Sequence, residues 1–222
     1  MPPQHILVIG AGGLGSAALP LLAAAAARLT VIDHDKVELS NLSRQLLYNE
    51  DDLARPKAEV AAERLRRQFP NLAVRWRAEK FSAENAAAFF SERPDLVMDL
   101  CDNETTRIAV SDAAFARDTA LVTAGLAGMH GQIAYLRRGD SGCYRCAFGA
   151  GDKSGEGTAS AAMATMTGSM AALVALRALA GNETAGRVVL VDGETLATEE
   201  LRARADPKCA VCGHTSQKGN RK

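Results

Sequence analysis

The stretch Ile6-Leu-Val-Ile-Gly-Ala-Gly-Gly-Leu-Gly15, with Leu29-Thr-Val-Ile-Asp-His-Asp35 after it, decides the fold of this chain. Residues 6–9 and 29–32 are short apolar runs, which are typical of strands buried in a parallel sheet. Residues 10–15 match G-x-G-x-x-G and lie between the first strand and the start of a helix. This order of strand, glycine turn, helix and strand predicts a nucleotide-binding unit of the Rossmann type.

The residues of this unit have separate expected roles. Gly10 suits a tight turn, Gly12 lets the backbone approach a phosphate, and Gly15 lets the helix pack closely on the strand. A helix that begins near residue 13 directs its free N–H groups and positive dipole end at that phosphate. Asp33 and Asp35 follow the second strand, roughly 20 residues after the turn, where an acidic side chain is placed for a ribose hydroxyl. We therefore expect a nucleotide here, and the motif alone leaves its identity open.

Length, composition and charge exclude several classes of protein. The chain has 222 residues, of which 47% are hydrophobic, so it can form one large domain with a full core. Its 26 basic and 26 acidic residues give a formal net charge of zero, which provides no general attraction to nucleic acid or to an anionic membrane. No secretory signal opens the sequence, and the apolar segments at 16–29 and 161–180 contain Pro20 and Arg177, as buried core helices can. We expect a cytoplasmic protein.

A polar loop at residues 36–45 follows the two acidic residues and carries Asn41, Arg44 and Gln45. A surface loop is the simplest interpretation of such a segment. Because it directly follows the predicted ribose-binding residues, however, its guanidinium group could reach the phosphates of a nucleotide held by the glycine turn. Both interpretations remain open from the sequence.

Lys57 and Asp102 are candidates for the same site from more distant segments. A helix predicted over residues 58–68 places Lys57 near its N-terminus, where the helix dipole does not stabilise a cation. Residues 96–100 predict another buried strand, and Asp102 and Asn103 follow it, at the strand end where α/β sheets bind ligands. A carboxylate there suits Mg²⁺ on nucleotide phosphates. An exposed lysine and a simple helix cap are the respective alternatives.

The remaining segments extend the same architecture. Strands are expected at 72–76, 120–123 and 132–137, with a terminal hairpin at 187–193 and 195–201. Helices are expected at 82–91, 104–118 and 161–180, a flexible turn at 125–131, a surface loop at 149–157, and a polar tail at 214–222. The predicted fold is therefore a mostly parallel Rossmann-like sheet with an antiparallel C-terminal extension.

Four of the five cysteines form two C-x-x-C pairs, Cys143 with Cys146 and Cys209 with Cys212. Four thiolates in a tetrahedron make a structural zinc site, which here would tie the C-terminal segment to the sheet extension. Disulfides are an alternative that a cytoplasmic location disfavours, and a redox pair is another that needs only one C-x-x-C. For Cys101 a small buried residue is favoured over a reactive thiol.

Taken together, these motifs resemble the ThiF/MoeB/HesA family, the bacterial relatives of ubiquitin-activating enzymes. The resemblance covers about residues 6–213 and implies a single adenylation domain at 1–213. The matching segments, in family order, are Gly10–Gly15, Asp33–Asp35, Ser40–Gln45, Pro56–Lys57, Asp99–Asn103, Cys143–Cys146, Gly168–Ser169 and Cys209–Cys212.

The resemblance implies an activity and a set of site residues. Members of this family bind Mg-ATP and adenylate the C-terminal glycine carboxylate of a small ubiquitin-fold sulfur carrier ending in Gly-Gly, for thiamine or molybdopterin synthesis. They are generally homodimers. Arg44 and Lys57 would neutralise phosphates and Asp102 would hold Mg²⁺, which makes these three the implied catalytic residues. The implied nucleotide-binding residues are Gly10, Gly12, Gly13, Gly15, Asp33, Asp35, Asn41, Arg44, Gln45, Lys57, Asp102 and Asn103.

Two departures from the family pattern bear on catalysis. Many members carry an N-terminal helix whose arginine reaches the partner subunit's nucleotide, and this chain starts almost at the first strand. Many also have a cysteine in the loop before the late helix, whereas the loop at 149–157 has none and offers only Ser154. We therefore expect the protein to stop at the adenylate and to leave sulfur transfer to a separate donor.

Three other functions remain as alternatives. A non-catalytic scaffold of the same fold would bind nucleotide and carrier without turnover. A dehydratase of this fold acting on modified tRNA is disfavoured by the neutral charge. An NAD-dependent oxidoreductase would leave Arg44 without a role.

Overall fold

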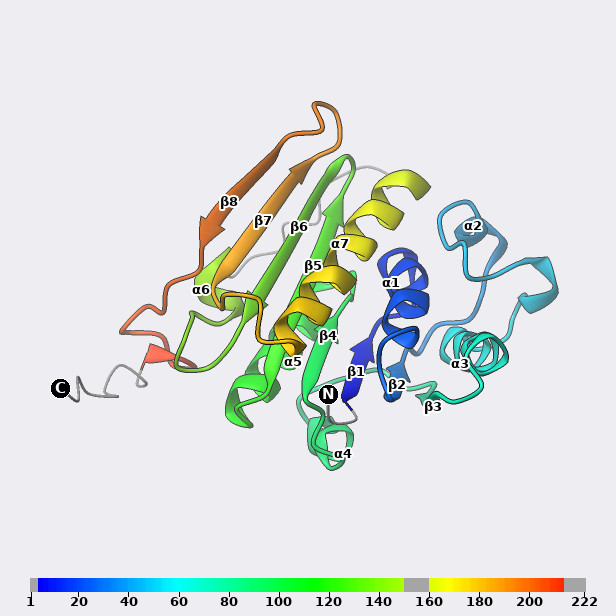
Figure 1. Ribbon diagram of the computed structural model, residues 1–222, viewed down its shortest axis with the longest axis horizontal. Coiled ribbons are helices and arrows are strands. Elements are labelled where there is room, and N and C mark those ends of the chain that lie inside the picture. The colour runs from blue at the N-terminus through cyan, green and yellow to red at the C-terminus, as the bar shows by residue number, and fades with distance from the viewer. Residues whose placement is uncertain (1–3, 150–159, 214–222) are drawn as a thin grey trace.

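The computed structural model describes residues 4–149 and 160–213. Within them, one sheet has the strand order β3-β2-β1-β4-β5-β6-β7-β8 (Figure 1). The strands are β1 (His5–Ile9), β2 (Arg28–Ile32), β3 (Ala73–Arg77), β4 (Leu96–Asp99), β5 (Ala120–Ala127), β6 (His130–Leu136), β7 (Arg187–Asp192) and β8 (Thr198–Arg202). The helices are α1 (Gly13–Ala23), α2 (Leu39–Leu42), α3 (Lys57–Gln68), α4 (Ala86–Phe90), α5 (Glu104–Ala116), α6 (Tyr144–Phe148) and α7 (Ala161–Leu179), with a short 3₁₀ helix η1 at Glu50–Asp52.

The strand pairing of the sheet changes from parallel to antiparallel at β5. Strands β3, β2, β1, β4 and β5 are parallel, and β5, β6, β7 and β8 pair antiparallel. Every residue of β1 and β4 is buried, which explains their nearly continuous apolar sequences. Strand order reverses between β1 and β4, because β2 lies on one side of β1 and β4 on the other. In such sheets the carboxyl ends at the reversal form the ligand crevice. The predicted fold class is confirmed.

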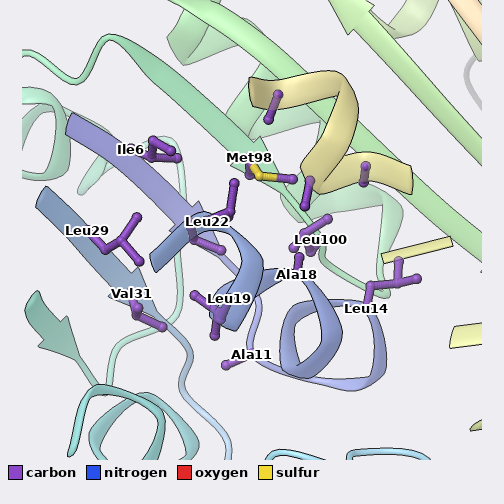
Figure 2. Packing of buried hydrophobic residues seen from close by; sticks show 14 of the residues in the cluster. Ile6, Ala11, Leu14, Ala18, Leu19, Leu22, Leu29, Val31, Met98 and Leu100 are labelled. Carbon is purple, nitrogen blue, oxygen red and sulfur yellow. The ribbon is translucent and has the colours of Figure 1, made fainter. Parts of the chain in front are cut away.

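Two hydrophobic layers hold the helices on the sheet. Figure 2 shows one of them, in which Leu14, Ala18 and Leu22 of α1 lie near Met98 of β4 and near Leu100. The neighbouring helix, α7, packs beside α1 and across β5 and β6 (Figure 1). Side chains of α4, α5 and α6 contribute to the second layer.

The contact between α1 and α7 depends on a glycine. A methyl group at Gly168 of α7 would overlap the carbonyl oxygen of Leu14 and lie 3.1 Å from the Cβ atom of Ala17. By length and composition α7 could cross a membrane, with a mean hydropathy of 1.4, and it is the one such helix in the described residues. Its buried alanines at 171, 172 and 175 belong to the core, as the sequence predicted for this segment.

The predicted flexible turn at 125–131 is wrong. Strand β5 continues to Ala127 and β6 begins at His130, so the turn shrinks to two residues, with Gly128 at φ 56°. The other glycines of this segment are there for close packing. A methyl group at Gly131 would overlap the hydroxyl of Thr167, and one at Gly125 would lie 3.0 Å from the side-chain nitrogen of Gln132. Glycine within a strand often marks such an approach rather than a turn.

The predicted helix at 82–91 is also shorter than expected. Asn85 accepts a hydrogen bond from the backbone N–H of Ser82 at 2.8 Å, which makes a turn of the residues before α4. The helix therefore begins only at Ala86. Most of the predicted loop at 149–157, with Ser154, and the tail at 214–222 lie outside the described residues.

Candidate functional site

The glycine turn connects β1 to α1. Gly10 has φ +100°, and a methyl group there would lie 2.6 Å from the carbonyl oxygen of Leu100. A methyl group at Gly15 would overlap the carbonyl oxygen of Gly10. At Gly12 the nearest atom to such a methyl group would be the side-chain nitrogen of Gln45, at an ordinary 3.6 Å. Packing therefore requires glycine at 10 and 15, as predicted, whereas the surroundings of position 12 would accept a methyl group.

Asp33 anchors this turn from the end of β2. Its carboxylate accepts hydrogen bonds from the backbone N–H of Ala11 at 2.7 Å and of Asp35 at 2.8 Å. Burial raises the pKa of Asp33, and the two backbone N–H groups oppose that rise. A carboxylate has about four lone-pair positions, so acceptor capacity remains for a sugar hydroxyl.

Lys57 is brought to the same place by the start of α3. Its ammonium nitrogen lies 3.0 Å from Asp35 Oδ2, and its side chain is 6% exposed. The Tyr48 hydroxyl lies 2.7 Å from the carbonyl oxygen of Ala11, to which it donates, and 3.4 Å from that of Lys57. Tyr48 thus ties the glycine turn to α3, a role for which the sequence contains no signal. Asp35, predicted to bind nucleotide, is here the counter-ion of Lys57.

The segment after β2, predicted as a polar loop, contains the one-turn helix α2 and contributes the predicted polar residues. An Arg44 nitrogen, Nη1, donates to the carbonyl oxygen of Ser40 at 3.1 Å, and the side chain of Asn41 donates to the Ser40 hydroxyl at 3.2 Å. Gln45 is 4% exposed, and its Oε1 has no hydrogen-bond partner among the described residues. A buried acceptor without a donor is costly, and a bound ligand could supply that donor.

For Asp102 and Asn103 the sequence left two roles open, capping of α5 and binding of a ligand. Asn103 is the N-cap of α5, because its side-chain oxygen accepts from the backbone N–H of Thr106 at 2.9 Å. Asp102 is exposed and does not cap the helix. Its carboxylate is therefore available to a ligand.

Arg107 of α5 is a residue that the sequence reasoning missed. Its guanidinium donates to the carbonyl oxygens of Ala124, at 2.7 Å, and Cys101, and lies 3.7 Å from the carboxylate of Asp99. It thus joins the segment after β4 to the middle of β5. Burial raises the pKa of Cys101 well above its ordinary value, which fits a small buried thiol rather than a nucleophile. The sequence feature that could have indicated a role for Arg107 at the site is its position one turn into the helix that follows Asp102.

Eleven of the twelve predicted nucleotide-binding residues line one cleft of about 340 Å³ at the carboxyl ends of β1, β2 and β4. The twelfth, Gly15, is buried beneath the turn. The volume lies in the usual range of small-molecule sites, about 300–1,000 Å³. The lining includes Gly10, Gly12, Gly13, Asp33, Asp35, Asn41, Arg44, Gln45, Lys57, Asp102 and Asn103.

A second cleft of about 560 Å³ adjoins the first. The two share Asp102, Arg107 and Leu126 in their walls. Beyond these, the second cleft is lined by residues of β5, β6, β7 and β8, by Glu104 of α5, and by Tyr144 and Phe148 of α6. The arrangement can place a second substrate beside a nucleotide.

The four paired cysteines lie together where the chain after β8 meets α6. Sγ–Sγ distances are 4.0 Å for Cys143–Cys146, 3.6 Å for Cys143–Cys209 and 3.4 Å for Cys146–Cys212. Four sulfurs at about 2.3 Å from a tetrahedral zinc would be about 3.8 Å apart, while a disulfide needs about 2.05 Å. Backbone N–H groups lower the pKa of Cys209 to about 7, which favours its thiolate. This cluster could bind zinc, as the spacing predicted.

Comparison with protein families decides the relationship that the motifs suggested. The model of the ThiF family matches residues 3–211. This chain belongs to the ThiF family. The resemblance inferred from the sequence is thereby confirmed.

Relatives of this ThiF-family chain carry closely similar names. It is 37% identical to a sulfur carrier protein adenylyltransferase of Thermus thermophilus, over 94% of this chain and 82% of the relative. Two Escherichia coli proteins are each 35% identical over 95% of this chain: a sulfur carrier protein ThiS adenylyltransferase, covered over 86%, and a molybdopterin-synthase adenylyltransferase, covered over 87%. Adenylyltransferases are nucleotidyltransferases. One name specifies ThiS, one specifies molybdopterin synthase and one specifies neither, so the names do not choose a pathway for this chain.

The fold is shared more widely. The crystal structure of E. coli MccB superposes with a TM-score of 0.83 at 18% identity, over 99% of this chain and 67% of that one. At that identity the likeness concerns the fold alone. It confirms the Rossmann-like sheet with an antiparallel extension that this ThiF-family sequence predicts.

Proposed function

We propose that this chain is an ATP-dependent adenylyltransferase that activates the C-terminal glycine carboxylate of a ubiquitin-fold sulfur carrier. The observation that carries the proposal is the single cleft that gathers the glycine turn, Arg44, Lys57 and Asp102. The relatives named as sulfur carrier adenylyltransferases support it. The carrier would belong to thiamine or molybdopterin synthesis.

The cleft fits ATP in its chemistry. The open backbone at Gly12 and the N-terminus of α1 can receive phosphates. Asp33 would accept the ribose hydroxyls, and the buried Gln45 oxygen would gain a donor. Arg44 and Lys57 would offset the charge of the phosphates.

In the reaction, a carboxylate oxygen of the carrier would attack the α-phosphorus of ATP. The bond between that phosphorus and the oxygen of the departing pyrophosphate breaks, and its electron pair leaves with the pyrophosphate. The carboxylate is already ionised at neutral pH, so no general base is needed. The two anions repel each other, so the role of Lys57 and Arg44 is to neutralise charge as they meet.

Asp102 would hold Mg²⁺ at the junction of the two clefts. Its exposed carboxylate, relieved of helix capping by Asn103, is an oxygen ligand of the kind this ion prefers. A bound Mg²⁺ would supply positive charge to the phosphates. Zinc at the four cysteines would be structural, because all four ligand positions are filled by protein.

Oligomeric state and location are further parts of the proposal. We propose a homodimer, since Leu21 of α1 and Leu173 of α7 are 44% and 59% exposed on helices that pack side by side. The separated sulfurs of the four cysteines suit a reducing compartment, so we place the protein in the cytoplasm. A separate donor would supply sulfur to the adenylated carrier.

The test is ATP–pyrophosphate exchange with purified protein, Mg²⁺ and candidate carriers ending in Gly-Gly. Asp102→Ala and Arg44→Ala should each lower the exchange rate about 100-fold or more, the usual effect of removing one electrostatic contact in a transition state. The matched controls are Asp51→Ala and Arg67→Ala, which change exposed charges outside both clefts and should keep the wild-type rate.

Other outcomes would support the alternatives. ATP binding without exchange for every carrier would favour a non-catalytic scaffold. Tight NAD binding without ATP binding would favour an oxidoreductase. Exchange that persists in both cleft variants would overturn the assignment of the catalytic residues.

A further inference from the structure

The floor of the second cleft is one face of the antiparallel extension. Gly125 of β5 pairs with Gln132 of β6, which pairs with Leu190 of β7. Residues paired across a sheet point to the same face, so the three positions form a row across the cleft. The α5 and α6 helices border this row through Arg107, Tyr144 and Phe148. Because the two clefts share Asp102, Arg107 and Leu126, an extended chain on this row would lead toward the nucleotide cleft.

Two nitrogen-bearing side chains converge above Gly125. A methyl group at this position would lie 3.0 Å from Gln132 Nε2 and 3.2 Å from Arg107 Nη2. The missing side chain thus makes room for both groups at the junction of the clefts. Arg107 is already bonded to the carbonyl oxygens of Ala124 and Cys101, which fixes its orientation.

The Gln132 amide is different, because its side chain makes no hydrogen bond to the described residues. It is half-buried and has Leu190, Tyr144 and Phe148 as apolar companions in the cleft wall. A polar amide held in such surroundings gains from a partner with a donor and an acceptor. A peptide unit of an extended chain has this combination, with one N–H and one C=O in fixed relation.

We propose that Gln132 binds the peptide backbone of the C-terminal segment of the acyl substrate, and that Gly125 makes the space for this contact. The inference rests on the proposed function and adds a substrate-binding residue to it. Gln132 lines the second cleft and does not line the nucleotide cleft. It therefore acts on the carrier and leaves ATP untouched.

The experiment compares Gln132→Leu and Gln132→Glu with wild type in carrier-dependent ATP–pyrophosphate exchange. The first variant removes both hydrogen-bonding groups, and the second removes the donor while keeping the shape. Each should raise KM for the carrier about tenfold, the effect of about 1.4 kcal/mol. The KM for ATP should stay within twofold, because loss of uniform carrier binding leaves the nucleotide site intact.

Gln68→Leu is the matched control, since Gln68 is exposed at the end of α3 and lines neither cleft. ATP titration of each variant shows whether its fold and nucleotide site survive. An unchanged carrier KM in a Gln132 variant that still binds ATP would overturn the inference alone. Wild type without exchange would instead overturn the proposed function, and the inference with it.

Discussion

At the residue scale, Gly12 and Gly15 belong to one motif, but a side chain would have different effects at the two positions. A side chain at Gly15 would overlap the backbone of Gly10, so the fold itself excludes it. At Gly12 the surroundings leave ordinary room, so the fold tolerates a methyl group there. We therefore attribute glycine at position 12 to the proposed nucleotide rather than to packing.

We predict that Gly12→Ala folds normally and loses at least tenfold in ATP affinity. The added methyl group stands where the backbone would approach a phosphate. Gly15→Ala should instead lower the free energy of unfolding by about 1–3 kcal/mol or more, as overpacking does. Urea unfolding and ATP titration of both variants check this, and tight ATP binding by Gly12→Ala would contradict it.

Asp35→Asn should destabilise the free protein and increase its stabilisation by ATP. Lys57 is nearly buried and loses its counter-ion in this variant, at a cost of about 1 kcal/mol because Asp35 is half exposed. Phosphates then supply the missing negative charge. Thermal unfolding with and without Mg-ATP measures both effects. If Mg-ATP raises the unfolding temperature of the variant no more than that of wild type, Lys57 does not contact the nucleotide.

At the scale of elements, the closeness of α1 and α7 determines the shape of the cleft. Gly168 allows α7 to approach the carbonyl oxygen of Leu14. Ala164, one turn earlier, would lie 3.3 Å from a methyl group at Gly13. The helix α7 therefore packs against the glycine turn. A substitution at the contact between α7 and α1 should alter the geometry of the nucleotide site.

We expect Gly168→Ala to lower the free energy of unfolding by about 1–3 kcal/mol and to weaken ATP binding, because α1 must move. The neighbouring Ser169→Ala, on a less buried part of the same helix, should change stability by at most about 0.5 kcal/mol. Urea unfolding measures the stability of both variants. The difference between them reports the loss of packing at position 168 rather than the effect of alanine on helix propensity. Equal stabilities of the two variants would show that α1 and α7 can move apart without lowering the free energy of unfolding.

At the scale of the whole molecule, the cysteine cluster ties the chain after β8 to α6. The two cysteine pairs are more than 60 residues apart in the sequence, yet all four ligand atoms lie within 4.8 Å of one another. The nucleotide cleft draws on none of these residues. Zinc should therefore stabilise the extension without taking part in ATP binding.

We predict one zinc per chain, lost on treatment with a strong chelator or in Cys209→Ser. Loss of the metal should expose the bond after Lys208 to trypsin, because this exposed lysine directly precedes a ligand. Metal analysis and limited proteolysis measure these effects, while ATP titration should show unchanged affinity. Rapid cleavage at Lys208 in the zinc-loaded protein would contradict the prediction.

Much of the fold and of the site could be predicted because it depends on local sequence. Gly15 is required for a steric reason within a few residues, because a side chain there would overlap the backbone of Gly10. Apolar runs such as Ile6–Ile9 reveal strands buried on both faces. The spacing of Cys143 and Cys146 reflects what one metal can reach. The carboxyl ends of parallel strands meet at one edge, so the sequence alone assigns Asp33 and Asp102 to one cleft.

The tertiary structure alone decided which side chains meet. It paired Lys57 with Asp35, made Asn103 rather than Asp102 the helix cap, and brought Arg107 and Gln132 together over Gly125. It also turned the glycines of the predicted turn at 125–131 into strand residues. These outcomes depend on contacts between distant segments and on the sharing of donors and acceptors in three dimensions. Residue type and spacing along the chain do not encode such contacts one by one, because they arise only when the helices and strands have packed.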